Sequence, residues 1–142
     1  MNDLERIDAA LIALRRLWTT PPRIDDPAFG SVEMSTIWVA DSLRRTPDQT
    51  VADLAGHMGV AHSTASRLIG RAERVGAVSR QPDPQDQRRV TVRLTPAGQM
   101  LAQTALHHRL AIVSGATHDF TVQERATFAD LLTRFTHRKD PQ

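Results

Sequence analysis

The arginines of residues 61–93 are the side chains whose type and spacing most clearly indicate a chemistry. This segment holds seven arginines and three acidic residues, a net charge of +4, whereas the whole chain of 142 residues has a formal net charge of +2. Arginine carries a planar fork of donors that fits phosphate groups and guanine edges, so the segment favours nucleic acid as a partner. Charge alone leaves a merely solvated basic face open. The seven are Arg67, Arg71, Arg74, Arg80, Arg88, Arg89 and Arg93.

Two short helices joined by a glycine turn are predicted to carry part of this segment. Thr50 and Asp53 have the spacing of a capping box, and Gly59 is suited to end the helix that they open. The inward residues of this helix are expected to be Val51, Leu54, Ala55 and Met58. The second helix begins with small polar residues and stops at Gly76, and its apolar face consists of Ala65, Leu68, Ile69, Ala72 and Val75. This arrangement is typical of a helix-turn-helix.

A hairpin is predicted directly after these helices, which makes the motif a winged helix. Residues 77–81 form its first strand and residues 89–94 its second. The second strand alternates with period two, so one set of side chains anchors the hairpin and the other faces outward. The anchoring set is Val90, Val92 and Leu94, and the outward set is Arg89, Thr91 and Arg93.

The loop of this hairpin, "PDPQDQR", is stiffened by its two prolines. We interpret Arg88 as a probe of the DNA minor groove, where negative potential is concentrated. Asp86, two residues away, is expected to hold the guanidinium of Arg88 in place before DNA arrives. A solvated turn whose charges have no function is the alternative.

Helices are predicted on both sides of the winged helix. The first runs from Leu4 to Trp18, and its stripe is Leu4, Ile7, Leu11, Leu14 and Trp18. The proline-rich stretch "TTPPRIDDP", residues 19–27, is expected to be a loop. A second helix follows from about Ser31, its N-cap, to Arg44, with an apolar face made of Met34, Ile37, Trp38 and Leu43.

Two more helices are predicted after the hairpin. Thr95 is a good N-cap and Pro96 suits the first position of a helix that runs to about Ser114. It carries Met100, Leu101, Leu106, Leu110 and Val113. Thr121 and Glu124 form a capping box for the last helix, whose apolar side is Val122, Phe128, Leu131, Leu132 and Phe135. The fold class is therefore mainly α with a small β-hairpin.

Composition narrows the class of protein. The chain suits a single globular domain, with 40% hydrophobic and 24% charged residues. No apolar run is long enough to span a membrane and the N-terminus does not resemble a signal peptide, so a soluble cytoplasmic protein is expected. The absence of cysteine excludes disulfides and thiol sensing. His107, His108 and His118 lack the spacing of a metal site, and no catalytic constellation is present, so we expect no metal, no cofactor and no enzymatic activity.

Residues 50–101 resemble the MarR-type transcriptional regulators. The most specific part is the wing, in which Asp86, one further residue and Arg88 are followed by an alternating strand that runs into Leu94, Thr95 and Gly98. The resemblance implies a single domain that forms a homodimer through its first, fifth and sixth helices. Residues 1–46 and 96–142 would mainly dimerise, and residues 47–95 would form the DNA-binding lobe.

The resemblance also implies site residues. The recognition-helix positions that meet double-stranded DNA are Ser63, Thr64, Ser66, Arg67 and Arg71, and the wing positions are Asp86, Arg88 and Arg89. Most such proteins are repressors that bind a pseudo-palindromic operator and are released by an apolar or phenolic ligand. Trp18 and Trp38 are candidates to line a ligand pocket, with an ordinary core role as the alternative. A winged-helix module that docks another protein is the second functional hypothesis.

One position departs from the family's pattern at the start of the recognition helix. Ala61 stands where a side-chain cap is usual, so the N-terminus of this helix needs another partner, and Ser63 is a candidate.

Overall fold

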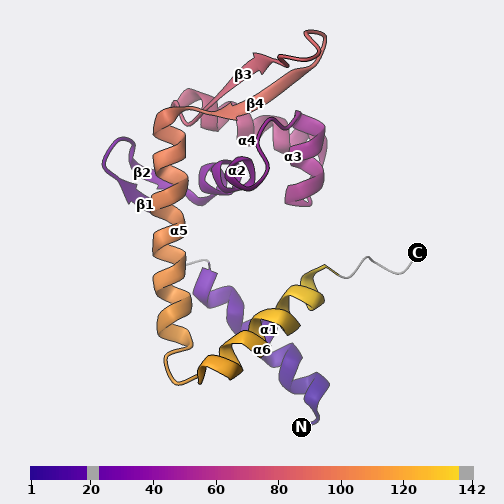
Figure 1. The fold of residues 1–142 in the computed structure, drawn as a ribbon, viewed down its shortest axis with the longest axis vertical. Helices are drawn as coiled ribbons and strands as arrows, with labels where there is room; N and C mark the ends of the chain where they lie inside the picture. Colours follow the sequence, from indigo (N-terminus) through magenta and orange to yellow (C-terminus); the bar gives the residue numbers. More distant parts are fainter. Residues whose placement is uncertain (19–22, 138–142) are drawn as a thin grey trace, which may run out of the picture. The chain divides into compact units, whose positions relative to one another are not determined.

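The computed structural model describes residues 1–18 and 23–137 (Figure 1). The chain divides into two compact units, residues 1–108 and residues 109–142. The first unit contains the predicted winged helix, and the second contains the end of one long helix and the last helix. The predicted order of helices and wing strands is confirmed, with one additional hairpin described below.

The core of the first unit lies among α2 (Met34–Arg45), α3 (Val51–Met58), α4 (His62–Arg74) and the start of α5 (Pro96–Ala116). The β3–β4 hairpin (Val78–Pro82 and Val90–Leu94) lies across these helices, and its tip extends beyond them (Figure 1). The largest fully buried apolar side chains come from every one of these elements except β3: Ile37, Val39, Leu43, Leu54, Ile69, Val92 and Leu101. Val78 of β3 and Val92 of β4 belong to the same core as the helices, so both strands anchor the hairpin.

The helix-turn-helix forms as the local sequence predicts. Thr50 and Asp53 make the reciprocal hydrogen bonds of a capping box, and Gly59 ends α3 in the left-handed region with φ +66°. On α4, Ala65, Ile69 and Ala72 are fully buried, whereas Val75 is exposed. Gly76, with φ +83°, follows the end of α4. Only Val75 departs from the predicted inward face, because it lies after the last turn of the helix.

The wing strand β4 differs from the predicted alternation. Val92 is buried as expected, but Val90 is half exposed and Thr91 is fully buried. Val90 pairs with Pro82 at the end of the ladder nearest the tip, where the helices no longer cover the hairpin. Closer to the root, the amide of Val92 donates to the carbonyl of Gln49 at 2.7 Å, so residue 49 adds a bridge to the open edge of β4. Because Thr91 and Val92 face opposite sides of the strand and both are buried, both faces of β4 are covered near its root.

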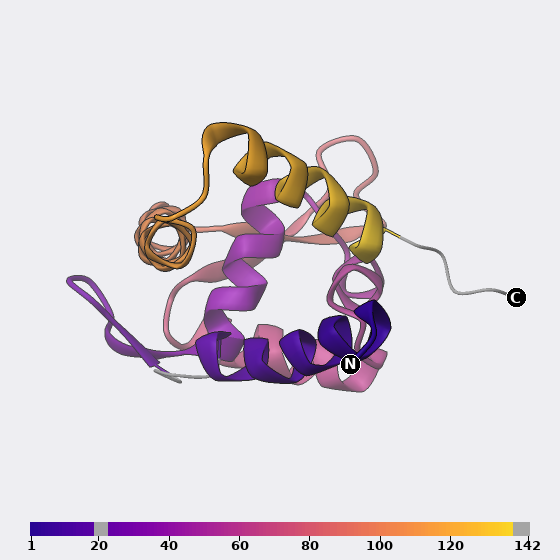
Figure 2. The same ribbon diagram turned by 90° about the horizontal axis from the view of Figure 1, so that it is seen from below.

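An unpredicted hairpin precedes α2. The stretch predicted as a loop contains β1 (Arg23–Asp26), which pairs antiparallel with β2 (Gly30–Glu33), and the hairpin projects from the N-terminal end of α2 (Figure 2). Asp26 Oδ1 accepts the amides of Ala28 at 2.8 Å and Phe29 at 3.2 Å, and Gly30 takes φ +69°, which together reverse the chain. The prolines led to the prediction of a loop over the whole stretch. The structure confines the turn to the residues after Asp26 and places a short strand on each side of it.

This hairpin moves the start of α2. Ser31, predicted as the N-cap, lies in β2, and the helix begins at Met34 with Glu33 as an N-cap that makes no side-chain capping bond. Trp38, predicted on the apolar face, is 56% exposed, whereas Ile37, Val39 and Leu43 are buried. The observed register of α2 therefore turns the tryptophan away from the core of the first unit.

The start of α5 is closely packed against the root of the wing. Thr95 Oγ1 accepts the amide of Gly98 at 3.0 Å, which confirms Thr95 as the cap, and its hydroxyl donates to the carbonyl of Gly76 at 2.6 Å. A Cβ atom at Gly98 would collide with the carbonyl group of Ala77. The glycine of the Leu-Thr-x-x-Gly stretch is thus required because helix and hairpin backbones approach each other here.

Much of the apolar surface outside this core is exposed. On α1 (Asp3–Trp18), Leu4, Ile7 and Leu11 are exposed. In the second unit, α6 (Val122–Thr136) begins with the predicted capping box of Thr121 and Glu124, and Phe128 packs edge-to-face on Phe120. The predicted apolar side of α6 is also exposed: Val122, Phe128, Leu131, Leu132 and Phe135. Over the described ranges, no helix combines the length and the hydrophobicity that crossing a bilayer requires.

Candidate nucleic-acid interface

The N-terminal half of α4 presents small polar residues and one arginine. Ser63 and Arg67 are exposed, and Thr64 and Ser66 are partly buried. Ala61 occupies the N-cap and provides no side-chain hydrogen bond. Within the described part of the chain, the side chain of Ser63, the predicted replacement cap, makes no hydrogen bond either. The first amides of α4 are therefore left without a side-chain acceptor, and such amides attract anions.

Four of the seven arginines in residues 61–93 are held by carboxylates of neighbouring elements. On the helices, Arg71 Nη1 lies 3.8 Å from Glu33 Oε2 of β2. Arg80 Nε of β3 lies 2.8 Å from Glu73 Oε1 of α4. Arg89 and Arg93 of the wing pair with acidic residues near the start of α3. Much of the basic charge predicted to face DNA is thus partly neutralised within the protein.

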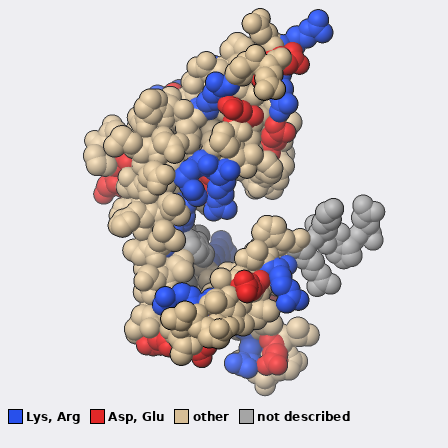
Figure 3. Space-filling view, in the orientation of Figure 1, with Lys and Arg blue, Asp and Glu red and all other residues tan. Residues whose placement is uncertain are grey.

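The other three arginines have no carboxylate partner among the described residues. Arg74 Nε donates to the carbonyl of Gly70 within its own helix, and Arg67 and Arg88 make no side-chain hydrogen bond or ion pair within the described ranges. Arg67 lies on the exposed side of α4 and Arg88 lies in the loop at the tip of the wing. In Figure 3 the outermost atoms of the wing are basic, and acidic atoms lie beside them. Arg67 and Arg88 are therefore available for an anionic partner.

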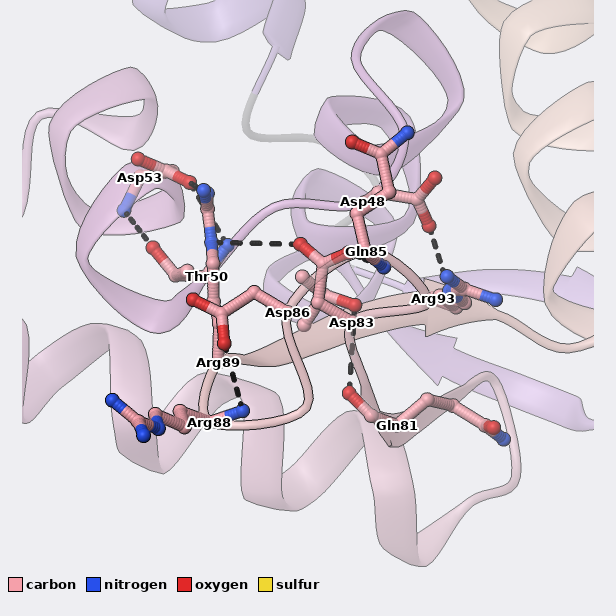
Figure 4. A network of polar contacts seen from close by, with 11 residues as sticks. Asp48, Thr50, Asp53, Gln81, Asp83, Gln85, Asp86, Arg88, Arg89 and Arg93 are labelled. Atoms are coloured by element: carbon pink, nitrogen blue, oxygen red, sulfur yellow. Dashed lines mark hydrogen bonds and ion pairs between the residues drawn. The ribbon is translucent and has the colours of Figure 1, made fainter.

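The loop of the wing is preorganised by hydrogen bonds to its own backbone (Figure 4). Asp83 Oδ1 accepts the amide of Gln85 at 2.9 Å, and Asp86 Oδ1 accepts the amide of Arg88 at 3.1 Å. The amide of Asp83 also donates to the carbonyl of Arg89 at 2.7 Å. Each aspartate therefore fixes a turn of the loop. A short aspartate side chain readily accepts the backbone amide two residues further along the chain.

The predicted contact between Asp86 and the guanidinium of Arg88 is corrected by this geometry. Asp86 orients Arg88 through the main chain, and the guanidinium of Arg88 extends away from it (Figure 4). The sequence spacing was informative about which two residues interact. It was wrong about the atoms, because a carboxylate two residues upstream reaches a backbone amide more readily than the end of a long side chain.

The alternation predicted that Arg89 and Arg93 face outward, but both side chains instead pair with carboxylates of residues 48–53. Arg89 Nη2 donates to Asp53 Oδ2 at 3.0 Å, and Arg89 Nε lies 3.9 Å from Asp83 Oδ2. Arg93 Nε lies 2.7 Å from Asp48 Oδ1. The pKa of Asp53 is lowered by the backbone and side-chain hydrogen bonds of Thr50, with a smaller contribution from Arg89. Asp53 is therefore a carboxylate that both caps α3 and binds the wing.

A model of the MarR family matches residues 40–90, from the second half of α2 to the first residue of β4. Residues 40–90 are thus similar to the winged helix-turn-helix of the MarR family. The resemblance predicted from residues 50–101 is confirmed by this match. The matched segment includes every recognition-helix and wing residue singled out in the sequence.

The chain is also similar to a curated protein. The chain is 33% identical over 90 residues to the uncharacterized HTH-type transcriptional regulator YsmB of Bacillus subtilis (strain 168). The alignment covers 63% of this chain and 62% of YsmB, so the chain matches less than two thirds of that relative.

Solved structures extend the similarity to the whole fold. A MarR family protein from Bacillus stearothermophilus is 25% identical, with a TM-score of 0.70 and 96% of each chain covered. Streptococcus pneumoniae FabT, in complex with DNA, is 20% identical with a TM-score of 0.71 and covers 94% of this chain and 95% of its own. PcaV of Streptomyces coelicolor, in complex with its natural ligand, is 21% identical with a TM-score of 0.67, and the match covers 96% of this chain and 92% of PcaV. The last two indicate fold alone, and the predicted fold class is confirmed.

The structure describes only one of the two candidate ligand side chains. Trp38 is exposed and is not a core residue of the first unit. The side chain of Trp18, at the end of α1, lies outside the described residues. Among the described residues, no three His, Asp or Glu side chains gather as a group that could hold a metal ion. A pocket lined by the two tryptophans stays a prediction.

Proposed function

We propose that this protein is a sequence-specific DNA-binding transcriptional regulator, which acts in the cytoplasm as a homodimeric repressor. One observation carries the proposal: Arg67 and Arg88, which make no side-chain hydrogen bond or ion pair among the described residues, lie on the recognition helix and at the wing tip of one MarR-type lobe. Recognition helices read base edges in the major groove, and an arginine gains most from a narrow minor groove. The fold shared with FabT, solved in complex with DNA, supports the same partner.

On α4 we assign Ser63, Thr64, Ser66, Arg67 and Arg71 to the major-groove surface. The small hydroxyl residues allow the helix to approach bases and phosphates closely, and Arg67 has the reach for a guanine edge. Arg71 is held only loosely by Glu33, at 3.8 Å, and both side chains are half exposed. A phosphate can therefore compete with Glu33 for Arg71, because an exposed ion pair is worth little in water.

The dimer is proposed from exposed apolar surface. In the first unit, α1 exposes Leu4, Ile7 and Leu11, and in the second, α6 exposes Phe128, Leu131 and Phe135 among others. Such stripes need a partner, and a second copy would place one recognition helix on each half of a pseudo-palindromic operator. Residues 1–46 and 96–142 are assigned mainly to this dimerisation, and residues 47–95 to DNA binding. Sedimentation equilibrium of the whole chain tests the assignment, since a monomer at micromolar concentration would contradict it.

A small apolar or phenolic effector is proposed to release the protein from DNA. The support is the fold shared with PcaV, solved with its natural ligand, together with the exposed Trp38 on α2. Tryptophan fluorescence during titration with simple phenolic acids tests this step, because a ligand against Trp38 or Trp18 changes emission. The expected result is a saturable change that parallels loss of DNA binding.

The experiment that tests the function compares DNA from upstream of the protein's own gene with a shuffled duplex of equal length and composition. Fluorescence anisotropy at several salt concentrations measures both the preference for the upstream duplex over the shuffled one and the contribution of charge to the binding affinity. A regulator is expected to prefer the upstream DNA and to lose affinity steeply as salt rises. Equal, weak binding to both duplexes would favour the alternative, a winged-helix module that docks another protein.

A further inference from the structure

The second wing strand and Arg89, the residue directly before it, are tied to residues 48–53 at three places, and Figure 4 shows the two that involve Arg93 and Arg89. Arg93 Nε lies 2.7 Å from Asp48 Oδ1, the amide of Val92 donates to the carbonyl of Gln49 at 2.7 Å, and Arg89 Nη2 donates to Asp53 Oδ2 at 3.0 Å. We propose that these three contacts, here called the wing brace, set the position of the wing before DNA binds, and that Asp53 is a positioning residue that acts through Arg89. The consequence for DNA binding rests on the proposed function.

The brace depends most on the pair of Asp53 and Arg89. The contact of Arg93 with Asp48 is an ion pair only, because the buried Arg93 Nε makes no hydrogen bond. The contact of Gln49 with Val92 lies in the middle of β4, two residues before Leu94, where the strand ends nearest α5. Among the described residues, Arg89 is the one whose side chain joins the edge of the loop to a helix, and its contact is both an ion pair and a hydrogen bond.

Asp53 is a fixed point because the capping box holds it. Its Oδ2 accepts the amide of Thr50 at 3.0 Å, and its own amide donates to Thr50 Oγ1 at 3.1 Å. The carboxylate therefore cannot follow the wing if the wing moves. Its charge is secured by the same bonds, which lower the pKa of Asp53.

Arg89 passes this constraint to the tip through its backbone. Its carbonyl accepts the amide of Asp83 at 2.7 Å and its amide donates to the carbonyl of Asp86 at 2.9 Å. Both ends of the loop thus meet at Arg89, and the free Arg88 is the residue directly before it. Fixing the guanidinium of Arg89 on α3 restrains the backbone from which Arg88 projects.

This role differs from the one predicted for Arg89, a direct contact with DNA. If Arg89 binds a phosphate, Asp53 competes with DNA, and removing the charge of Asp53 raises affinity. If Arg89 is part of the brace, removing that charge loosens the wing and lowers affinity, although the protein becomes less negative. The two roles therefore predict opposite signs for the same substitution.

The primary experiment uses amide hydrogen exchange of the full chain without DNA. Asp53→Asn keeps an oxygen that can accept the amide of Thr50 but removes the charge, and Asp53→Glu keeps the charge and the capping box. We expect Asp53→Asn and Arg89→Gln to speed exchange in residues 83–89 by about two- to fivefold, the range that a half-exposed ion pair supplies. The double variant should add little to either single one, and Asp53→Glu should match the unmodified protein.

Amide hydrogen exchange in α3 distinguishes loss of the wing brace from loss of the capping box. If Asp53→Asn speeds residues 53–58 as much as residues 83–89, the effect is loss of the cap alone and the proposal is overturned. Unchanged exchange in residues 83–89 also overturns it. Neither result depends on DNA, so the brace and the proposed function fail separately.

The DNA arm tests the consequence. Asp53→Asn and Arg89→Gln are expected to weaken binding to the preferred duplex by about two- to fivefold without changing the salt slope, whereas Arg88→Gln lowers that slope by about 1. Tighter binding by Asp53→Asn, or a salt slope lowered by Arg89→Gln, would return Arg89 to the set of direct DNA contacts and contradict the positioning role.

Discussion

Asp86 and Arg88 meet through the main chain: Oδ1 of Asp86 accepts the backbone amide of Arg88 at 3.1 Å, and the guanidinium of Arg88 stays without a carboxylate partner among the described residues. The aspartate thus sets where the arginine begins while leaving its charge available. Under the proposed function, this relationship explains how an acidic residue would assist binding to DNA, which is itself an anion.

Replacing Asp86 tests this role. Asp86→Ala is expected to weaken DNA binding by roughly fivefold, since the loop loses a backbone hydrogen bond worth about 1 kcal/mol. Anisotropy with the preferred duplex measures the change, and Asp86→Asn, which retains the acceptor oxygen, is the control and should lose much less. Unchanged or tighter binding by the alanine variant would contradict the assignment, because removing a negative charge alone favours binding.

Arg67 is expected to read sequence. Arg67→Ala should weaken binding to the preferred duplex by about 1 to 3 kcal/mol, with a smaller effect on shuffled DNA, if its fork contacts a guanine. Arg80→Ala is a matched control, because Arg80 is held by Glu73 at 2.8 Å and should matter less. An equal loss on both duplexes would reassign Arg67 to a phosphate contact.

Gly98 is expected to be intolerant of any side chain. Gly98→Ala places a Cβ against the carbonyl of Ala77, so the root of the wing and the start of α5 must separate. We expect a loss of about 1 to 3 kcal/mol in the free energy of unfolding, measured by urea denaturation. Gly115→Ala, where an added Cβ meets nothing within 4 Å, is the control. A similar stability for Gly98→Ala would refute the close approach.

The capping box of α3 predicts a pH dependence. Hydrogen bonds from Thr50, assisted by Arg89, lower the pKa of Asp53 in the folded protein below its ordinary value of 3.8. Its contribution to stability is therefore complete above 3.8 and is lost as the pH falls through the lower, folded value. The stability difference between the unmodified protein and Asp53→Asn should shrink in urea denaturation series taken from about pH 6 to about pH 2. A difference that is constant or grows on acidification would contradict this.

Features encoded locally were predictable from the sequence. The capping boxes of Thr50 with Asp53 and Thr121 with Glu124, the left-handed Gly59 and the Thr95 cap each depend on residues within a few positions of one another. Their formation needs no knowledge of the rest of the fold. The same holds for the order of helices, which hydrophobic periodicity sets.

Features that depend on distant residues were not predictable. Arg89 and Asp53 are 36 residues apart, and Arg71 meets Glu33 from a strand that the sequence was not expected to form. An alternating strand indicates which side chains share a face, but not what lies opposite that face. The β1–β2 hairpin had one usable signal, an Asp-Pro turn followed by glycine, and the proline content of the stretch obscured it.

The most direct test of the central claim, that this chain is a dimeric sequence-specific DNA-binding protein, is a hydroxyl-radical footprint on DNA from upstream of its own gene. The account predicts two protected half-sites related by a pseudo-two-fold axis, with centres about 10 base pairs or a multiple of that apart, and minor-groove protection that Arg88→Ala removes. Uniform cleavage at protein concentrations that saturate any binding, or a single unpaired site, would contradict it.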